Sequence, residues 1–333
     1  MDDSLVQYEV EPNYAGWTLA DYILEKLKRP MPADRLERML RSRALVHAET
    51  ELLPETKVWP GLRFSLRKRS PGDTGEPLPL RFVFEDEALL VVDKPAGLAI
   101  HPTARYHVST LTWALEARHK NAAGEKPDPA HRLDRETSGL VACGRNSLYT
   151  RNLKAQFAGR QVSKSYLALV EGHPVDDGFA IDYPLKVGGG RVKVKVNVDP
   201  SGAASVTSCE VLERYQDAQG KPLTLLRCIP LTGRQHQIRA HLHAAGFPLV
   251  GDKLYGPSEE IFLRLAESGG SPAPQGEYDD LITQEERAAL RMPRQALHAA
   301  TLSFAHPITK EPLHFEAPLP EDIAGLIATL RPL

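Results

Sequence analysis

Three cysteines are too few and too widely separated to build a disulfide framework or a cysteine-rich metal site. Cys143, Cys209 and Cys228 form no C-x-x-C pair, which favours a reducing compartment. No stretch approaches the ~20 apolar residues that a membrane-spanning helix needs. The first residues, MDDSLVQYEVEP, are acidic where a signal peptide would be apolar. The sequence therefore predicts a soluble, cytoplasmic protein.

A strong excess of either charge is also absent, since 41 Lys and Arg and 43 Asp and Glu give a formal net charge of −2. Nucleic-acid binding must therefore come from local clusters of basic residues. The chain carries neither a P-loop nor a dinucleotide fingerprint. Gly188, Gly189 and Gly190 precede a predicted strand rather than a helix, which favours a hairpin turn. We predict no cofactor.

Proline and glycine are concentrated at 71–79, where they interrupt every periodic pattern. We interpret this stretch as a linker between residues 1–70 and a body that spans residues 80–333, which a chain of this length accommodates. Residues 257–293 are typical of an insertion, because acidic residues heavily outnumber basic ones from Glu259 to Arg287 and the stretch contains a Gly-Ser-Pro-Ala-Pro break. Since phosphates repel acidic groups, we expect this insertion to lie away from any nucleic-acid surface.

Residues 1–70 predict two helices followed by strands. Two apolar stripes carry the helices, and they consist of Leu19, Ile23, Leu24 and Leu27, and of Leu36, Met39 and Leu40. Basic residues, among them Arg38 and Arg41, lie between and beside the stripes. Such a concentration is typical of a surface that follows phosphates, and a solvated helix face is the alternative.

The body contains more predicted strands than helices, joined mostly by short turns, which favours an α+β fold with a mixed, mainly antiparallel sheet and flanking helices. Strands are predicted in LRFVFEDEALLVVDKP, which reads as a hairpin, and in LVACG, SYLALVEG, VKVKVNV, SVTSCEVLERY and LTLLRCIPL. Helices are predicted at 109–118 with Ser109 as N-cap, at 147–158, and from Thr232 as N-cap to Gly246.

The most informative segment is HRLDRETSGL, residues 131–140, which places Asp134 between Arg132 and Arg135. Neighbouring guanidinium groups lower a carboxyl pKa by roughly 1–3 units, so Asp134 stays ionised and able to act as a nucleophile. A surface ion pair worth about 0–1 kcal/mol is the competing interpretation of the same charges.

Five further segments follow a fixed order with it: DKPAGLAIHP, KSYLALVEG, LTGRQHQIRAHL, GFPLVGDKLYG and RQALHA. The ensemble resembles the RluA-type family of RNA pseudouridine synthases over essentially the whole body. The resemblance implies the pseudouridine synthase fold and an isomerase that converts a uridine of structured ribosomal or transfer RNA to pseudouridine. It also implies that Asp134 is the nucleophile and that Tyr166 and Arg234 are catalytic.

This reaction breaks a nitrogen–carbon glycosidic bond and rejoins the same ring at its carbon five. An ionised carboxylate near the anomeric carbon is therefore needed. Because a buried carboxylate requires a partner, we expect Arg234 to pair with Asp134 in bidentate form. Tyr166 is expected to stack on the base and to help remove the carbon-five proton.

The target uridine must leave its stack, at a cost of a few kcal/mol. We expect Arg132 to stack on the RNA bases, with a phosphate contact as the alternative. Lys164 is expected to neutralise a phosphate or to support Asp134. Arg191 and Lys193 alternate with valines and are expected to face phosphates, unless they lie on a solvated strand.

Within the N-terminal segment, RLERMLRSRALVH resembles the small S-four-like RNA-binding module that is often fused to these synthases. That module usually carries a Gly before its strand and an Asn-Gly after it, and this chain has Arg43-Ala44 and His47-Ala48 instead. The resemblance predicts the fold of the module and leaves its RNA binding open.

Two other functions remain open. A catalytically inactive RNA-binding relative would be expected to lack Asp134, Tyr166 or Arg234, and all three are present. A metal-dependent hydrolase would use His236, His241 and His243, which have no Glu at H-E-x-x-H spacing. We expect no metal, a structured RNA as the partner, and a monomer, because no apolar helix stripe is left unpaired.

Overall fold

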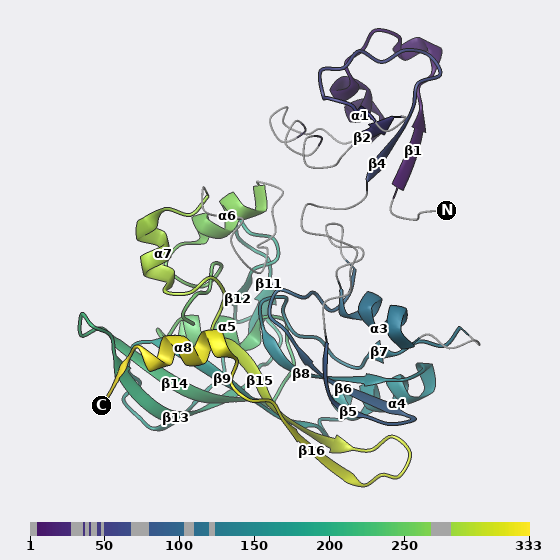
Figure 1. The fold of residues 1–333 in the computed structure, drawn as a ribbon. Coiled ribbons are helices and arrows are strands. Elements are labelled where there is room, and N and C mark those ends of the chain that lie inside the picture. The colour runs from purple at the N-terminus through teal and green to yellow at the C-terminus, as the bar shows by residue number, and fades with distance from the viewer. Residues whose placement is uncertain are drawn as a thin grey trace.

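The computed structural model describes residues 5–27, 36, 40, 45–47, 50–67, 80–102, 110–119, 124–267 and 281–333. The predicted linker at 71–79, the predicted RNA contacts Arg38 and Arg41, and the predicted N-cap Ser109 lie outside these residues. The described elements form two groups, each with its own sheet (Figure 1). None of the described helices is both long and apolar enough to cross a membrane.

The N-terminal group, purple in Figure 1, is a four-stranded antiparallel sheet with strand order β1-β4-β2-β3. Its elements are β1 (Leu5–Glu9), a 3-10 turn (Pro12–Tyr14), α1 (Leu19–Leu27), β2 (Leu45–His47), β3 (Thr50–Glu51) and β4 (Arg63–Arg67). Leu19 and Ile23 of α1 pack with Leu36 and Leu40 in one core, so both predicted apolar stripes contribute to it. This core contains residues of the N-terminal group alone.

The body is built on one eleven-stranded sheet with the main order β10-β13-β14-β9-β15-β8-β6-β5. β7 pairs with β8, β16 with β15 and β17 with β13. All pairs of this sheet are antiparallel within the described residues except β8 with β15. The predicted α+β fold with a mixed, mainly antiparallel sheet is confirmed.

The predicted hairpin and the predicted helices at 109–118 and 147–158 are found, and so are the predicted strands LVACG, SYLALVEG, SVTSCEVLERY and LTLLRCIPL. The strands are β5 (Arg81–Glu85), β6 (Leu89–Lys94), β7 (Asp128–Pro129), β8 (Ser138–Gly144), β9 (Ser163–Glu171), β10 (Gly178–Ile181), β11 (Leu185–Val187), β12 (Val196–Val198), β13 (Thr207–Gln216), β14 (Pro222–Pro230), β15 (Leu297–Ala305), β16 (Pro312–Glu316) and β17 (Arg331–Pro332). The helices are α3 (Leu111–His119), α4 (Ser147–Ala158), α5 (Gln237–Ala244), α6 (Glu259–Glu267), α7 (Gln284–Leu290) and α8 (Glu321–Ala328).

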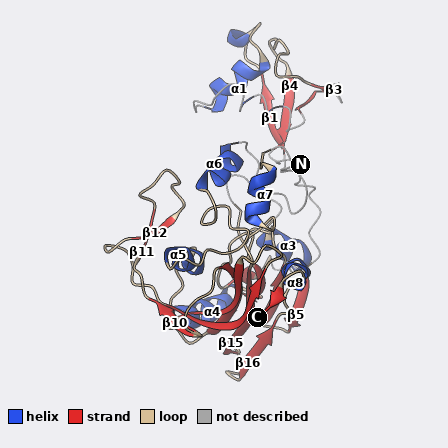
Figure 2. Ribbon diagram, turned by 90° about the vertical axis from the view of Figure 1, so that its left-hand side faces the viewer, coloured by secondary structure: helices blue, strands red, loops and turns tan. Residues whose placement is uncertain are grey.

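The central strands are covered on both faces. Because side chains alternate along a strand, Leu90 and Val92 of β6 face one layer while Leu89 and Val91 face the other. The first layer contains α3 and α5, and the second contains α4 together with the β15–β16 hairpin. Figure 2, turned by 90°, shows α5 to the left of these strands in that view, α3 and α8 to their right, and α6 and α7 above them. Tyr166 of β9 lies in the layer of α3 and α5.

Two predicted elements differ from the structure. VKVKVNV forms a strand only at Val196–Val198, because residues 188–195 are the loop of the β11–β12 hairpin, in which the predicted Gly-rich turn lies. The helix predicted to start after Thr232 begins at Gln237 instead. Its preceding residue His236 has φ 51°, and the Thr232 hydroxyl donates to Gln237 Oε1 at 2.7 Å rather than capping the helix. Gly246, with φ 88°, follows the end of this helix as predicted.

The glycine of HRLDRETSGL is required by the parallel pairing of β8 with β15. Gly139 lies opposite Ala299 with φ +111°, and a Cβ added there would lie 2.3 Å from the carbonyl oxygen of Ala299. No L side chain fits that space, because the atoms that the Cβ would meet are backbone atoms of Ala299, which the sheet holds in place. The segment that follows Asp134 is thus fixed in register against β15.

We predict that Gly139→Ala destabilises the protein by about 2–4 kcal/mol, the sum of backbone strain and a steric clash in the sheet. Gly220→Ala is the control: Gly220 also has positive φ, at +77°, but nothing lies within 4 Å of an added Cβ. Its cost should be only the left-handed strain, about 1–2 kcal/mol. Thermal unfolding of both variants measures the difference, and equal losses would contradict the steric argument.

Candidate active site

Asp134 lies in the loop between β7 and β8, and several hydrogen bonds fix that loop. The Asp134 carbonyl accepts from Thr137 N at 3.1 Å, which closes a turn. The Arg135 carbonyl accepts from Gly97 N at 2.8 Å and from Lys94 Nζ at 3.1 Å. The segment DKPAGL therefore holds the backbone directly next to Asp134.

Lys94 was not predicted as a site residue, although it belongs to the DKPAGLAIHP segment. It is fully buried, and its Nζ also donates to the carbonyls of Pro95 at 2.8 Å and Leu98 at 3.0 Å. Burial lowers the pKa of Lys94 to about 7. Its three carbonyl acceptors match the three hydrogens of an ammonium group, so its role is to join two loops.

The partner of Asp134 is Arg239, and the expected pairing with Arg234 is wrong. Arg239 Nη1 donates to Asp134 Oδ2 at 2.8 Å, while Arg234, at the start of the same segment, is exposed. The reason is the late start of α5: residues 231–236 form a loop, and Arg239 is the arginine that the helix buries. Both arginines stand in LTGRQHQIRAHL, so helix phase was the signal that could have selected Arg239.

Arg239 also binds Asp252, which sequence reasoning missed. Nε donates to Asp252 Oδ2 at 2.7 Å and Nη2 to Oδ1 at 2.9 Å, so this contact is a bidentate fork. Asp252 is fully buried and Arg239 is nearly so. Asp252 is the acidic residue of GFPLVGDKLYG, and a buried carboxylate of that kind needs a cation beside it.

Electrostatics keep Asp134 ionised. Burial opposes ionisation, but the charges of His236 and Arg239, the Arg239 hydrogen bond and the charge of Arg132 together lower the pKa of Asp134 below its usual value. Because burial lowers the pKa of His236 to about 4, its positive charge is present only in acid, and at pH 7 the guanidinium groups of Arg239 and Arg132 remain to hold the pKa of Asp134 down. Arg239 is therefore the buried cation that holds the Asp134 charge at neutral pH.

Tyr166, which the resemblance makes a site residue, is buried and lies near enough to Asp134 to be influenced by its charge. Only 9% of the residue is exposed, and both burial and the Asp134 charge raise its pKa. On the sheet it pairs with Cys228 of β14 on one side and Ala299 of β15 on the other. Its hydroxyl stays protonated at neutral pH, so it can donate a hydrogen bond in the site.

The other predicted site residues of the motifs differ in exposure: Arg132 and Arg234 are exposed, and Lys164 is half-buried. Arg132 is exposed and close enough for its charge to lower the pKa of Asp134. Lys164 is half-buried, with its Nζ 5.9 Å from the ring centroid of Phe157 and 3.6 Å from where a Cβ on Gly233 would lie. Lys164 thus lies beside the TGR loop, whereas Arg234 and Arg132 are exposed to solvent.

Part of the acidic insertion contacts the hairpin that we expected to face phosphates, so that expectation and the expectation that the insertion lies away from RNA cannot both hold. Lys195 donates to Glu259 of α6 at 3.1 Å, and Arg191 pairs with Glu260, the next residue of that helix. Lys193 is exposed. The acidic helix therefore lies against the hairpin that we expected to face phosphates, because opposite charges attract across the gap between them.

Histidines of the TGR segment are engaged in the fold. His241 is fully buried and bonds to Thr207 Oγ1 and to the Tyr183 carbonyl, both at 2.9 Å. Among the described residues, no three His, Cys, Asp or Glu side chains are placed to hold a metal ion. His131 accepts a hydrogen bond from Ala142 N at 3.1 Å, which is a structural role.

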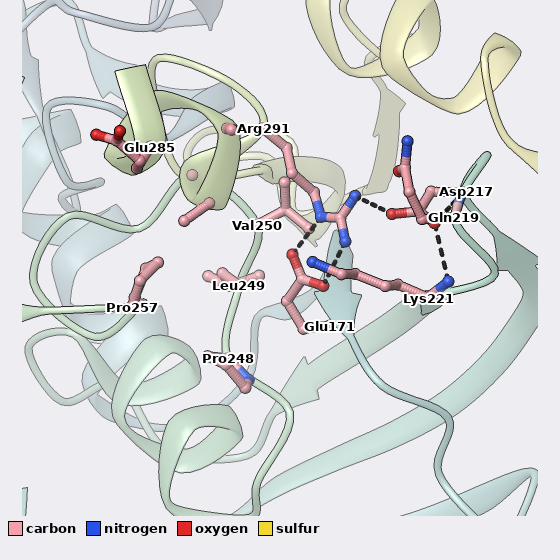
Figure 3. Close-up of a pocket in the computed structure, with 14 residues that line it drawn as sticks. Glu171, Asp217, Gln219, Lys221, Pro248, Leu249, Val250, Pro257, Glu285 and Arg291 are labelled. Carbon is pink, nitrogen blue, oxygen red and sulfur yellow. Dashed lines mark hydrogen bonds and ion pairs between the residues drawn. The ribbon is translucent and has the colours of Figure 1, made fainter. Parts of the chain in front are cut away.

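A hollow of about 670 Å³, which Asp134 does not line, lies between α7, the β13–β14 turn and residues 248–257 (Figure 3). Arg291 bridges two carboxylates there: Nε and Nη2 bind Glu171 at 2.6 and 3.2 Å, and Nη1 binds Asp217 at 2.7 Å. None of the predicted site residues lines it. Its arginine nevertheless has the same two-carboxylate geometry as Arg239.

Comparison with known proteins gives consistent results. The family model for RNA pseudouridylate synthase matches residues 88–244. The chain is 35% identical to the ribosomal large subunit pseudouridine synthase D of Xanthomonas campestris, over 99% of this chain and 94% of that protein. It is 36% identical to an uncharacterized RNA pseudouridine synthase, YlyB, of Bacillus subtilis, over 77% of this chain and 74% of that protein.

Among solved structures, human RNA pseudouridylate synthase domain containing 1 is similar, with a TM-score of 0.57 and 27% identity. The match covers 78% of this chain and 91% of the human chain. The matched family segment contains Asp134, Tyr166, Arg234 and Arg239.

We predict that Arg239→Gln destabilises the protein by about 3–5 kcal/mol, because two buried carboxylates lose their shared cation. Arg234→Gln is the matched control and should change stability by no more than about 0.5 kcal/mol, since its side chain is exposed. Urea unfolding at neutral pH measures both. A larger loss for the Arg234 variant would restore the pairing expected from the sequence.

Proposed function

Because the chain belongs to the RNA pseudouridylate synthase family, we propose that it isomerises a uridine of large-subunit ribosomal RNA with Asp134 as the nucleophile. Relatives that match nearly the whole chain are named for the large ribosomal subunit, which supports this substrate over transfer RNA. The observation that carries the catalytic assignment is the ionised Asp134, whose side chain is largely buried and is held by Arg239.

The geometry around Asp134 suits this chemistry. Oδ2 is occupied by Arg239 Nη1, while Oδ1 faces the neutral His236 ring at 3.8 Å. One carboxylate oxygen is thus available to capture or stabilise the anomeric carbon as its bond to the base nitrogen breaks. The base then rejoins through its carbon five, and the proton on that carbon leaves. Tyr166, kept protonated by burial, is proposed to stack on the base and to hydrogen-bond in the site, and it must release its own proton before it can accept this one.

The RNA surface is proposed to begin at Arg132, whose exposed guanidinium lies beside Asp134 and can stack on a base or bind a phosphate. Lys164 extends it along the TGR loop, with Arg234 exposed nearby. Arg191 and Lys193 are proposed to add phosphate contacts from the β11–β12 hairpin. We further propose a cytoplasmic monomer, which suits a ribosomal RNA substrate.

The proposal predicts a specific loss of pseudouridine. Mapping pseudouridines across all RNA of cells with and without the gene should reveal at least one large-subunit site that depends on it. A gene copy carrying Asp134→Asn should fail to restore that site. A dependent site in transfer RNA would overturn the proposed substrate, and the absence of any dependent site would favour an inactive relative. Restoration by Asp134→Asn would exclude Asp134 as the nucleophile.

Tyr166→Phe should slow product formation in vitro more than it weakens RNA binding.

Residues 1–70 are proposed as an RNA-binding module. Its described part has a separate sheet and core, and Arg38 and Arg41 belong to its basic cluster. Removal of residues 1–70 should weaken RNA affinity and reduce the slope of log affinity against log salt, because fewer phosphates are neutralised. Affinity that is unaltered at every salt concentration would show that this surface does not contact RNA.

A further inference from the structure

The buried guanidinium of Arg239 is divided unequally between two carboxylates. Asp252 takes Nε and Nη2, at 2.7 and 2.9 Å, and leaves only Nη1 for Asp134 Oδ2 at 2.8 Å. An arginine facing a single carboxylate tends to bind both of its oxygens in a parallel fork. Asp252 therefore determines which nitrogen reaches Asp134 and how many of its oxygens are occupied.

Asp252 is itself held rigidly. Its Oδ1 also accepts from the backbone N of Leu254 at 2.9 Å and of Tyr255 at 3.0 Å. Gly256 permits the tight turn, because a Cβ there would lie 2.1 Å from the Asp252 carbonyl oxygen. The segment GDKLYG thus forms one tight turn. This turn fixes the Asp252 carboxylate against Arg239 of α5.

Tyr255 closes the arrangement from the other side. Its ring lies 5.0 Å from the Arg239 guanidinium carbon, and its hydroxyl bonds to Val196 N at 2.8 Å and to His236 Nδ1 at 3.2 Å. Arg239 therefore has a carboxylate on one edge and an aromatic face beside it. It cannot rotate to offer a second nitrogen to Asp134 without leaving both.

The charges of the cluster also leave one oxygen of Asp134 without a cation. One guanidinium serves two carboxylates, and His236 is neutral at pH 7, so the cluster of Asp134, Arg239 and Asp252 carries a net negative charge. The other charged groups whose fields reach Asp134 include Arg132 and Lys94. The single hydrogen bond from Arg239 keeps Asp134 ionised. Because Arg239 is shared with Asp252, the second oxygen of Asp134 keeps its negative charge and its nucleophilic character.

We propose that Asp252 is a positioning residue for the isomerisation, which restricts Arg239 to one hydrogen bond with Asp134 and so keeps the second Asp134 oxygen available to the substrate. This inference rests on the proposed role of Asp134 as the nucleophile. It assigns a purpose to GDKLYG, which lies more than a hundred residues after Asp134.

The test uses the full-length enzyme and total RNA from cells that lack the gene, which contains the unmodified substrate whatever its identity. In Asp252→Asn, the fork loses its charge and Arg239 is free to bind both oxygens of Asp134. The single-turnover rate of pseudouridine formation should fall by about 10–100-fold, the loss expected from a displacement near 1 Å. The dissociation constant for the RNA should change by less than about twofold, because Asp252 is fully buried.

Glu171→Gln is the matched control. Glu171 forms the equivalent fork on Arg291, whose Nη1 binds Asp217, in a hollow that none of the predicted site residues lines (Figure 3). It should lower the melting temperature as Asp252→Asn does and leave the rate unchanged. If Asp252→Asn does not fold, Asp252→Glu replaces it: it keeps the charge, and its longer side chain should lower the rate with unchanged RNA affinity.

A wild-type rate in whichever Asp252 variant folds overturns the inference. Parallel losses of rate and RNA affinity, or an equal loss of rate in Glu171→Gln, also overturn it, because they indicate general damage to the fold. Asp134→Asn separates the two levels. Turnover by that variant would remove the proposed function, whereas an inactive Asp134→Asn beside a fully active Asp252→Asn would remove only the positioning role.

Discussion

The arrangement of this active site depends on one buried guanidinium that serves two carboxylates. Arg239 pairs with Asp134 and Asp252, and all three are partly or fully withdrawn from water. Removing one partner of such a set is far more costly than its net contribution suggests, because a buried charge is left without a counter-ion. The loop before β8, helix α5 and the turn at residues 251–256 must therefore keep their relative positions for the fold to remain stable.

The central sheet holds these three segments in fixed relative positions. β8 carries the end of HRLDRETSGL into the middle of the sheet, where every residue of the strand is buried and Gly139 lies against Ala299 of β15. β9, next to β15, presents Tyr166 on the face that α5 covers. Residues separated by a hundred positions in the chain thus meet through strand register and helix phase. Lys94 adds the last restraint by binding the carbonyl next to Asp134.

Much of this could be predicted from the sequence, and the failures have a common cause. Periodicity predicts the strands β9, β13 and β14 and the helix at 147–158, because each of them alternates between buried and more exposed residues and this pattern is local. The motif alone made Asp134 a candidate, and its ionisation followed from nearby arginines. The choice between Arg234 and Arg239 was not local. It depended on His236 adopting a left-handed conformation, which starts α5 late and turns Arg239 inward. The alternation of VKVKVNV was misleading because a loop of the β11–β12 hairpin also alternates in polarity.

The acidic helix beside that hairpin changes how its basic residues should be understood. Arg191 and Lys195 already have carboxylate partners in α6 when no RNA is bound. The Arg191–Glu260 pair is exposed, whereas the Lys195–Glu259 pair is partly buried. An exposed pair contributes about 0–1 kcal/mol, since water and salt screen both charges. A phosphate backbone that releases condensed counter-ions as it binds can therefore displace such a pair at small cost. The pairs hold the hairpin against α6, and the small contribution of the exposed pair leaves the phosphate contacts proposed for Arg191 and Lys193 compatible with the structure.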